Sequence, residues 1–489
     1  MRTLSFPRHT GVLLALLALP GCASVPHMGP AATIAPAGHY AASQSLAPAT
    51  MAAWPGADWW TSYGDPQLDA LIGEALAGSP DLAAAMARVR RADAFAQQAG
   101  AARLPTLDVN ASGAAAKQSY NNGIPADFVP KGWNSTGNVH GSLGFDLDLW
   151  GRNRAAYAAA RSDAAAAQLD YQQAALMLST NIADAYADLA RLFAQRDVQQ
   201  TALGVREQTQ SLVGDRVASG LDTQAEFRQA AAAVPAARSD LAATDEQIGL
   251  MRNRLAALLG AGPDRGLAID APAVSIAARG IPADVTTDLV GRRPDIAAAR
   301  VRVEAEASRI KVARADFYPA VSLSAIFGVQ SLGLSNLFKS GSDYGSAGPA
   351  ISLPIFRGGA LQGQYRGARA AYDEAVASYD RTVTDAYRAV ADAIVSRRAL
   401  DVQLAQSRTS LADYEAAHAI ATQRYEGGLS TFLDVLSAQD RALQARRIVA
   451  DLQSRAFTLD IALVRALGGG FTSSASAART TPSKDDSHG

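Results

Sequence analysis

The sequence predicts a mainly α-helical protein with a small β part, in which four short strands per chain cross a membrane and the helices form long coiled coils. Three patterns predict this class: an internal repeat of about 200 residues, an unbroken heptad pattern, and short segments of alternating apolar and polar residues. The composition agrees, because 48% of the 489 residues are hydrophobic but only 7% are aromatic, which suits long Ala-rich helices.

The internal repeat pairs motifs in the same order in both halves of the chain. The hexapeptide beginning at Pro80 recurs at Pro294, and the heptapeptide beginning at Gly220 recurs at Gly428. Two copies of one unit are therefore predicted. The expected organisation is a leader at 1–21, an N-terminal tether at 22–60, the first copy at 61–260, a linker at 261–285, the second copy at 286–468 and a disordered tail at 469–489.

Each copy is predicted to contain a helix, two strands and two very long helices. Residues 138–149 and 321–329 alternate between apolar and polar side chains, and a strand of about ten residues can cross a bilayer when it is tilted. A sheet inside a soluble domain fits the same period. If the strands do lie in lipid, four of them cannot close a barrel and open edges are forbidden, so three chains would share one barrel of twelve strands.

The long helices carry the clearest pattern. From Tyr379 to Tyr425 a series of mostly apolar positions steps by four and three without a slip, which predicts a coiled-coil seam. A helix from Gly359 to Tyr425 would be roughly 100 Å long. Gly428 then predicts a helix stop with positive φ, and capping boxes are expected to open the next helix at Thr431 and Asp434, and in the first copy at Thr223 and Glu226.

The N-terminus has the pattern of a cleaved leader. An apolar run at 11–19, too short to span a bilayer, is followed by Leu19-Pro20-Gly21-Cys22. This resembles a bacterial lipobox, in which Cys22 becomes the lipidated first residue; an ordinary secretory leader with a chance cysteine is the alternative. The absence of Asp after Cys22 favours, by the same resemblance, sorting to the outer membrane.

Composition and motif searches argue against several other functions. The net charge of −1 leaves no positive field for nucleic acid, and a single cysteine permits no intrachain disulfide. Six scattered histidines and the absence of HExxH, GxxxxGK[ST] and GxSxG motifs argue against an enzyme. Gly358-Gly359 is interpreted as a point of close helix approach, and His418 as a packed seam residue rather than a metal ligand.

The motifs together resemble the TolC-like outer-membrane factors, in particular their NodT-type lipoprotein branch, from Cys22 to Gly468. The resemblance is carried by Trp59-Trp60, Asp65-Pro66-Gln67-Leu68, the run from Phe145 to Gly151, the run from Gly291 to Ile296, Phe317-Tyr318-Pro319, Leu353-Pro354-Ile355-Phe356 and the run from Tyr425 to Val435. It implies a homotrimer with a twelve-stranded outer-membrane barrel, continued by a long α-helical coiled-coil barrel through the periplasm. Such a trimer is the passive exit duct of a tripartite efflux pump.

The resemblance also implies site residues. In the family a Tyr, an Arg and rings of Asp close the periplasmic end, and Tyr425 and Asp434 match the Tyr and the first Asp. Ser430 stands where some members have the Arg, and Ser437 where some have a second Asp. Asp434 has a second interpretation as a helix cap. The tips Gly220-Leu221 and Gly428-Leu429 resemble those that meet the periplasmic adaptor, although a plain Schellman stop explains them equally well.

Partners and alternatives follow from the same resemblance. The expected partners are two further copies of the chain, a periplasmic adaptor, an inner-membrane pump and outer-membrane lipid; no cofactor is expected beyond a covalent lipid on Cys22. The outer-membrane component of a type I polypeptide secretion system is one alternative, and a lipid-anchored periplasmic coiled-coil scaffold is another. Nothing in the sequence identifies the substrate.

Overall fold

The computed structural model describes residues 24–36, 39–46, 52–275, 280, 282 and 285–472. The predicted leader, Cys22 and most of the predicted tail therefore lie outside the described residues. The chain divides into two compact units. Unit 1 comprises Met1–Ile34, Val89–Ala167 and Ala299–Tyr379, and unit 2 comprises Ala35–Arg88, Gln168–Ala298 and Asp380–Gly489. Each unit therefore combines segments from both halves of the sequence.

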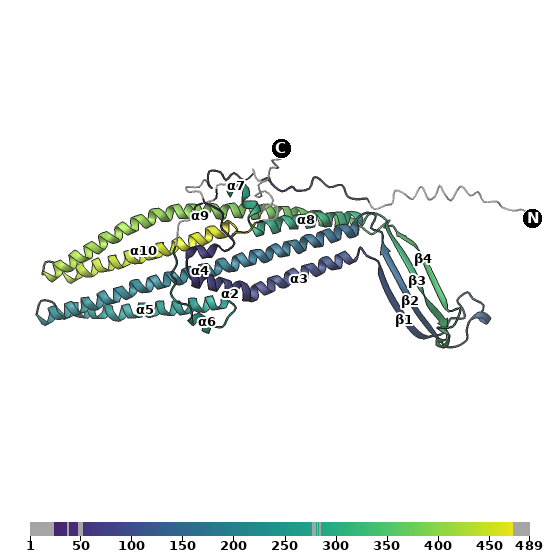
Figure 1. The fold of residues 1–489 in the computed structure, drawn as a ribbon, viewed down its shortest axis with the longest axis horizontal. Coiled ribbons are helices and arrows are strands. Elements are labelled where there is room, and N and C mark those ends of the chain that lie inside the picture. The colour runs from purple at the N-terminus through teal and green to yellow at the C-terminus, as the bar shows by residue number, and fades with distance from the viewer. Residues whose placement is uncertain are drawn as a thin grey trace, which may run out of the picture. The chain divides into compact units, whose positions relative to one another are not determined.

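A four-stranded antiparallel sheet forms one part of unit 1 (Figure 1). The strands follow one another in chain order, with β1 and β4 at the edges: β1 Thr106–Ala116, β2 Asn134–Asp146, β3 Ala320–Leu332 and β4 Asp343–Ser352. The prediction of four strands per chain is confirmed. Short 3-10 turns, Ala126–Phe128 and Leu334–Asn336, lie in the two hairpin loops.

The register of the sheet sorts its side chains by polarity. Val109 pairs with Gly141, which pairs with Phe327, and these odd-numbered positions form an apolar face. The even-numbered face carries Asn110 opposite His140. The predicted alternation is thus present in β2 and β3, where the odd-numbered face is mostly apolar and the even-numbered face mostly polar.

The strand predicted at 138–149 ends earlier than the alternating pattern suggested. β2 ends at Asp146, because Asp148 adopts a φ of +45°, the one positive φ at a non-glycine residue in the described part of the chain. A residue in the left-handed region cannot continue a strand. The backbone N–H of Leu147 still donates to Val321 at 3.0 Å, so the chain turns one residue after the last ladder bond.

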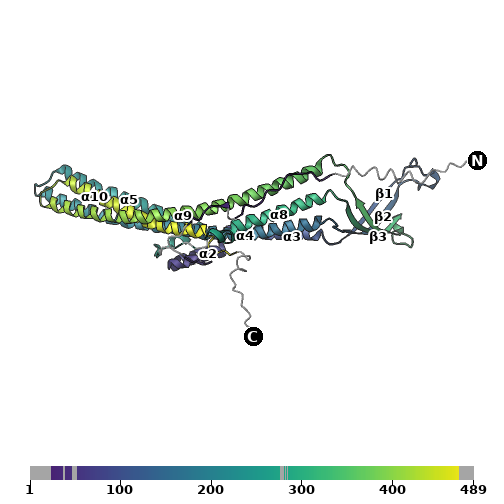
Figure 2. The ribbon, with the colours of Figure 1, turned by 90° about the horizontal axis from the view of Figure 1, so that it is seen from above.

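The helices occur in pairs of equal length, one from each half of the chain. α3 (Pro80–Ala101) and α8 (Pro294–Ala315) each have 22 residues; α4 (Arg152–Ala218) and α9 (Ala360–Glu426) have 67; α5 (Gln224–Leu258) and α10 (Phe432–Ala466) have 35. Within unit 2, α5 runs back along α4 and α10 runs back along α9 (Figures 1 and 2). None of the helices in the described residues is both long and apolar enough to cross a membrane.

The short elements of unit 2 are η3 (Trp59–Tyr63), α2 (Pro66–Gly78), α6 (Asp264–Leu267), α7 (Val285–Asp288) and η5 (Leu289–Gly291). Of these, η3 and α2 contribute side chains to the main hydrophobic core. The Asp65-Pro66-Gln67-Leu68 motif is central to this region. Asp65 is 4% exposed and caps α2 through the Gln67 N–H, while its other oxygen accepts from the Tyr186 hydroxyl at 2.7 Å. The Ala273 N–H also donates to Asp65 at 2.9 Å, so one buried carboxylate joins α2, α4 and the linker.

The predicted coiled-coil seam of α9 is buried over only part of its length. In unit 2 Val383, Ala386, Val390 and Leu400 are buried, but Tyr414 is 37% exposed. The interpretation of Gly358-Gly359 as a close approach of helices is wrong. Both glycines have positive φ, and a Cβ built on either would meet no neighbour within 4 Å. They turn the chain into α9.

The N-terminal tether is docked on α9 in the described residues. In unit 1 the Ala32 N–H donates to Asp373 at 3.0 Å, and Arg369 donates to the Gly29 carbonyl at 3.2 Å. Val25 and Met28 pack against a cluster formed by Ala313, Phe317, Leu361 and Tyr365. In unit 2 the Ala35 N–H and the Tyr40 hydroxyl both donate to Asp380.

Candidate functional site

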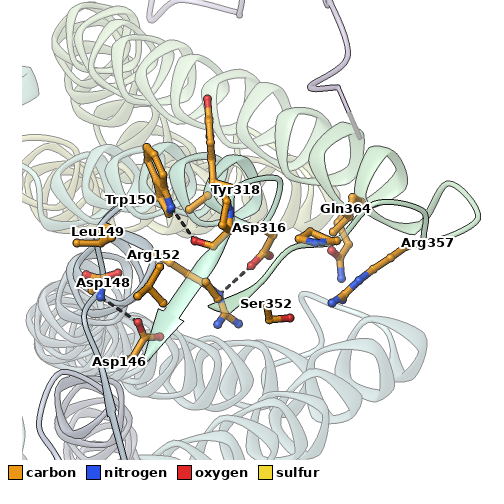
Figure 3. A pocket seen from close by; sticks show the side chains of 16 residues that line it. Asp146, Asp148, Leu149, Trp150, Arg152, Asp316, Tyr318, Ser352, Arg357 and Gln364 are labelled. Carbon is orange, nitrogen blue, oxygen red and sulfur yellow. Dashed lines mark hydrogen bonds and ion pairs between the residues drawn. The ribbon is translucent and has the colours of Figure 1, made fainter. Parts of the chain in front are cut away.

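The turn from β2 into α4 is built by two carboxylates (Figure 3). Asp146 accepts from the Asp148 N–H at 2.9 Å and from the Asn153 side chain at 3.1 Å. Asp148 accepts from the N–H groups of Asn153 at 2.8 Å and Arg154 at 2.9 Å. Those N–H groups belong to the first turn of α4 and have no partner within the helix, so Asp148 acts as an N-terminal cap. Asp148 adopts an unfavourable positive φ, and this backbone conformation points its carboxylate at the first turn of the helix.

Three further contacts tie this turn to the segment that enters β3. The Trp150 ring stacks on Tyr318 with centroids 4.7 Å apart, and its Nε1 donates to the Pro319 carbonyl at 2.7 Å. Arg152 pairs with Asp316 at 2.8 Å. Together these residues line a cavity of about 280 Å³ in unit 1. The charges of Arg152 and Asp316 are paired with each other. Within the described residues, no group of three His, Cys, Asp or Glu side chains could hold a metal ion. The motif from Phe145 to Gly151 is thus a structural corner.

The tips of the two hairpins in unit 2 form the stronger candidate site. After α4, Gly220 has a φ of +73°, and the Leu221 N–H donates to the Arg216 carbonyl at 2.9 Å. After α9, Gly428 has a φ of +72°, and the Leu429 N–H donates to the Arg424 carbonyl at 2.7 Å. This bond, from the residue after the positive-φ glycine to a carbonyl five residues back, defines a Schellman motif. The positive φ predicted at Gly428 is confirmed, and Gly220 adopts the same conformation.

The helices that leave the tips begin with the predicted caps. At α5 the Glu226 carboxylate accepts from the Thr223 N–H at 2.6 Å, and the Glu226 N–H donates to the Thr223 hydroxyl at 3.4 Å. At α10 the Asp434 carboxylate accepts from the Thr431 N–H at 2.9 Å and also from the Thr431 hydroxyl at 2.8 Å. Both capping boxes are therefore confirmed. The hydrogen bonds from Thr431 lower the pKa of Asp434.

One polar cluster joins the two tips. The Tyr425 hydroxyl, at the end of α9, donates to Asp222, which lies in the first tip. Arg216, near the end of α4, donates to both oxygens of the same carboxylate, at 3.0 Å and 3.4 Å. The guanidinium carbon of Arg216 lies 4.4 Å from the centroid of the Tyr425 ring, within the range of a cation–π interaction. Arg216, Asp222 and Tyr425 are called the tip cluster below.

The tip cluster is largely withdrawn from water. The side chains of Arg216 and Asp222 are 14% and 7% exposed. Burial would raise the pKa of the Asp222 carboxyl, but the hydrogen bonds from Arg216 and Tyr425 outweigh it and lower that pKa. Burial and the bond to Asp222 raise the pKa of the Tyr425 phenol. At neutral pH the cluster is therefore an ion pair with a neutral phenol that donates to the anion.

An apolar cluster lies beside the polar one. Val213, Ala230, Tyr425, Phe432 and Val435 are buried together, and the rings of Tyr425 and Phe432 lie 5.9 Å apart. These residues come from α4, α5, α9 and α10. The association of the two hairpins at their tips thus combines apolar burial with the tip cluster.

The predicted site residues differ in how the structure places them. Tyr425 lies in the tip cluster, whereas Asp434 is exposed and its hydrogen bonds go to Thr431. Leu221 and Leu429 are 66% and 72% exposed. Asp222 and Arg216 were not predicted as site residues, although both lie in the repeat: Asp222 aligns with Ser430, and Arg216 with Arg424. The two tips share Gly-Leu-x-Thr, but the first has a charged Asp222 where the second has Ser430. This difference could have pointed to Asp222 as a site residue.

Comparison with known proteins decides the family. The profile of the family described as "Outer membrane efflux protein" matches residues 71–261 and 286–469, most of the chain. The chain belongs to this family. It is an outer membrane efflux channel protein and not an enzyme. The predicted resemblance to TolC-like outer-membrane factors is confirmed.

Individual relatives support the assignment. The efflux channel is 37% identical to the fusaric acid resistance protein FusA of Burkholderia cepacia, over 73% of the chain and 68% of the relative. It is 32% identical to the multidrug resistance outer membrane protein MdtP of Escherichia coli K12, over 86% of the chain and 87% of the relative. Among solved structures, the outer membrane protein VceC of Vibrio cholerae shares 46% identity and a TM-score of 0.81, covering 86% of the channel and 100% of VceC. These matches confirm the TolC-like fold.

Proposed function

We propose that three copies of this chain close one twelve-stranded barrel and form the passive exit duct of a tripartite export system. The observation that carries the proposal is the sheet itself. It has four strands, an apolar and a polar face, and unpaired edges at β1 and β4. Backbone groups at a sheet edge cannot remain unpaired in lipid, and pairing β1 of one chain with β4 of the next satisfies both edges.

The oligomeric state is tested in detergent solution. Light scattering coupled to size-exclusion chromatography is expected to give three times the protomer mass. A second measurement uses planar bilayers, in which the purified protein should produce discrete conductance steps. A monomeric mass together with the absence of conductance would contradict the proposal.

We infer a small-molecule substrate in preference to a polypeptide. FusA and MdtP are named for resistance to fusaric acid and to multiple drugs. Because this chain shares 37% and 32% identity with them, export of organic compounds is favoured over type I polypeptide secretion. Deletion of the gene is expected to increase susceptibility to amphipathic drugs without loss of any secreted protein. The opposite pattern would favour the secretion alternative.

We propose that Leu221 and Leu429 meet the periplasmic adaptor, which would link the duct to an inner-membrane pump. Both leucines follow the positive-φ glycine of a tip, Gly220 or Gly428, and both are exposed. One exposed leucine alone needs no partner, so the proposal is supported by the matched placement of the two leucines in equivalent turns. Leu429→Asp should reduce drug export while the trimer and the protein level stay unchanged. Leu429→Met, which keeps an apolar side chain, is the control and should retain export.

We also propose that Cys22 carries a lipid anchor. The support is its position after the apolar leader and the docking of residues 24–36 on α9, which would hold the anchor against the channel. Cys22→Ser should abolish incorporation of labelled palmitate. The barrel would still hold the protein in the outer membrane, so part of the export activity should remain. Wild-type labelling of the variant would contradict the assignment.

A further inference from the structure

A basic groove lies in unit 1 where α4 begins and α8 ends. Three cationic side chains line it: Arg154 of α4, and Lys311 and Arg314 of α8. The stacked rings of Trp150 and Tyr318 belong to the same wall. The rest of the lining is glycine, alanine and serine, and these small residues leave a volume of about 550 Å³. The groove is therefore basic, partly aromatic and large enough to admit part of a ligand.

Two of the three cations in the groove have no counter-charge. The Nε of Arg154 lies 3.2 Å from the Asp148 carboxylate, so this guanidinium is paired. Lys311 and Arg314 form no hydrogen bond or ion pair with any residue that the structure describes. The next acidic residue along the chain, Asp316, is already paired with an arginine of α4 at 2.8 Å. Two positive charges beside one another without an acidic partner favour an anion.

The groove lies beside the ends of two strands. β2 ends at Asp146 and β3 begins at Ala320, and Trp150 and Tyr318 lie in the short segments that join these strand ends to α4 and α8. In the proposed duct the sheet crosses the outer membrane, so the strand ends mark the membrane surface. Trp150 is 52% exposed, and tryptophan and tyrosine are enriched at that surface, where their rings meet the lipid headgroups.

The periodicity of α8 places the groove on the outer side of the proposed duct. The even-numbered, polar face of the sheet is the one that lines a barrel lumen, and Asp146 and Ser352 of this face line the cavity of Figure 3 together with Asp316. Asp316 continues the helix, because its N–H donates to the Val312 carbonyl at 3.2 Å. Lys311 precedes Asp316 by five residues, which is about 140° around a helix. Lys311 therefore points away from the side that carries Asp316 and the lumen-facing residues.

We propose that this groove binds the phosphate of an anionic phospholipid in the periplasmic leaflet of the outer membrane, an inference that rests on the proposed barrel. Lys311 and Arg314 donate hydrogen bonds to the phosphate oxygens, and the exposed Trp150 ring packs on the lipid below its headgroup. Basic pockets at the membrane surface recognise anionic headgroups in this way. A soluble phosphate offers the same oxygens, but it would leave the Trp150 ring uncovered, so the lipid is the occupant that uses both parts of the groove.

The test is native mass spectrometry of the purified full-length protein in a neutral detergent. Phosphatidylglycerol, phosphatidylcholine or inorganic phosphate is added, and the bound molecules are counted. The wild type should retain phosphatidylglycerol in preference to phosphatidylcholine, and inorganic phosphate at the same concentration should not displace it. The double variant Lys311→Gln/Arg314→Gln should bind phosphatidylglycerol about tenfold or more weakly. Its melting temperature without lipid should match the wild type, because neither side chain has a partner to lose.

Two matched variants control for charge and for folding. Lys311→Arg/Arg314→Lys exchanges the two cations and keeps both charges, so it should retain the preference for phosphatidylglycerol. Arg408→Gln/Arg441→Gln removes two exposed positive charges from unit 2, and it should bind the lipid like the wild type. A general attraction of the protein for anionic lipid would instead weaken equally in both glutamine variants, which would overturn the assignment to the groove.

The remaining outcomes separate the inference from the function on which it rests. If the wild type gives no conductance in planar bilayers, the proposed duct fails and the inference fails with it. A conducting channel that shows no preference for phosphatidylglycerol, or that keeps its preference in Lys311→Gln/Arg314→Gln, overturns the inference alone. Displacement of the lipid by inorganic phosphate at equal concentration would make the groove a site for soluble anions and would overturn the choice of a lipid.

Discussion

Tyr425 and Asp222 lie 203 residues apart in the chain, yet the Tyr425 hydroxyl donates a hydrogen bond to the Asp222 carboxylate. The bond connects the end of α9 with the tip that follows α4, so it joins the two hairpins of one chain. Arg216 holds the same carboxylate from α4. A contact between the two hairpins opposes their separation at the tips, and the first prediction tests whether it also holds the channel closed.

The first prediction concerns the strength of this contact. Tyr425→Phe removes one hydrogen bond to a charged acceptor, and Asp222→Asn removes the charge that Arg216 requires, so each should destabilise the tip by about 1–3 kcal/mol. Both act on one carboxylate, so the double variant should cost less than the sum. Under the gate hypothesis, single-channel conductance in planar bilayers rises in both variants. A lower melting temperature with unchanged conductance would limit the cluster to a structural role.

The second prediction is an acid threshold for the same contact. The pKa of Asp222 is lowered from its ordinary value of 3.8. A carboxyl group whose folded pKa is depressed contributes stability that is present above the unfolded pKa and is lost as the pH falls through the folded one. Conductance should therefore be the same at neutral pH and at about pH 5, and should rise only below about pH 4. Asp222→Asn should lack this rise in conductance at acid pH. A rise that persists in the variant would come from the protonation of other carboxylates.

The third prediction uses two adjacent glycines of one tip. Gly428 has a φ of +72° and open space around its Cα, so Gly428→Ala meets no clash but adopts an unfavourable backbone region. The cost should be about 1 kcal/mol or more per chain. Gly427 lacks a positive φ, and an added Cβ would make ordinary contacts at 3.5 Å, so Gly427→Ala should leave stability unchanged or raise it slightly. Calorimetry of both variants compares the two sites, and equal melting temperatures would contradict this account.

Particular residues show which features of the fold follow from local sequence and which depend on tertiary packing. The long helices, the four strands and the capping boxes were predictable, because their signals are local: a heptad period, an alternating period, and a Thr three positions before Glu226 or Asp434. The bond between Asp222 and Tyr425 was not predictable, because no local pattern reports which hairpin packs on which. Asp148 ended β2 early for a related reason, since its role as a cap outweighed an alternation that continued through Leu149.

The last prediction separates the two interpretations of Asp434. Asp434→Asn keeps an oxygen that can accept from the Thr431 N–H, so the cap of α10 should largely survive. Because the pKa of Asp434 is lowered by its hydrogen bonds with Thr431, the carboxylate is charged at neutral pH, and the substitution removes three negative charges from the proposed trimer.

The matched control for Asp434 is Glu226→Gln, which alters the equivalent capping carboxylate of α5. If Asp434 lines a constriction, cation selectivity measured by reversal potential should fall in Asp434→Asn and stay at the wild-type value in Glu226→Gln. If Asp434 only caps its helix, both variants should lower the melting temperature by similar small amounts and neither should change selectivity. Because both substitutions make the same chemical change at the same helix position, a difference in selectivity between them can arise only from where the two carboxylates lie in the assembled channel.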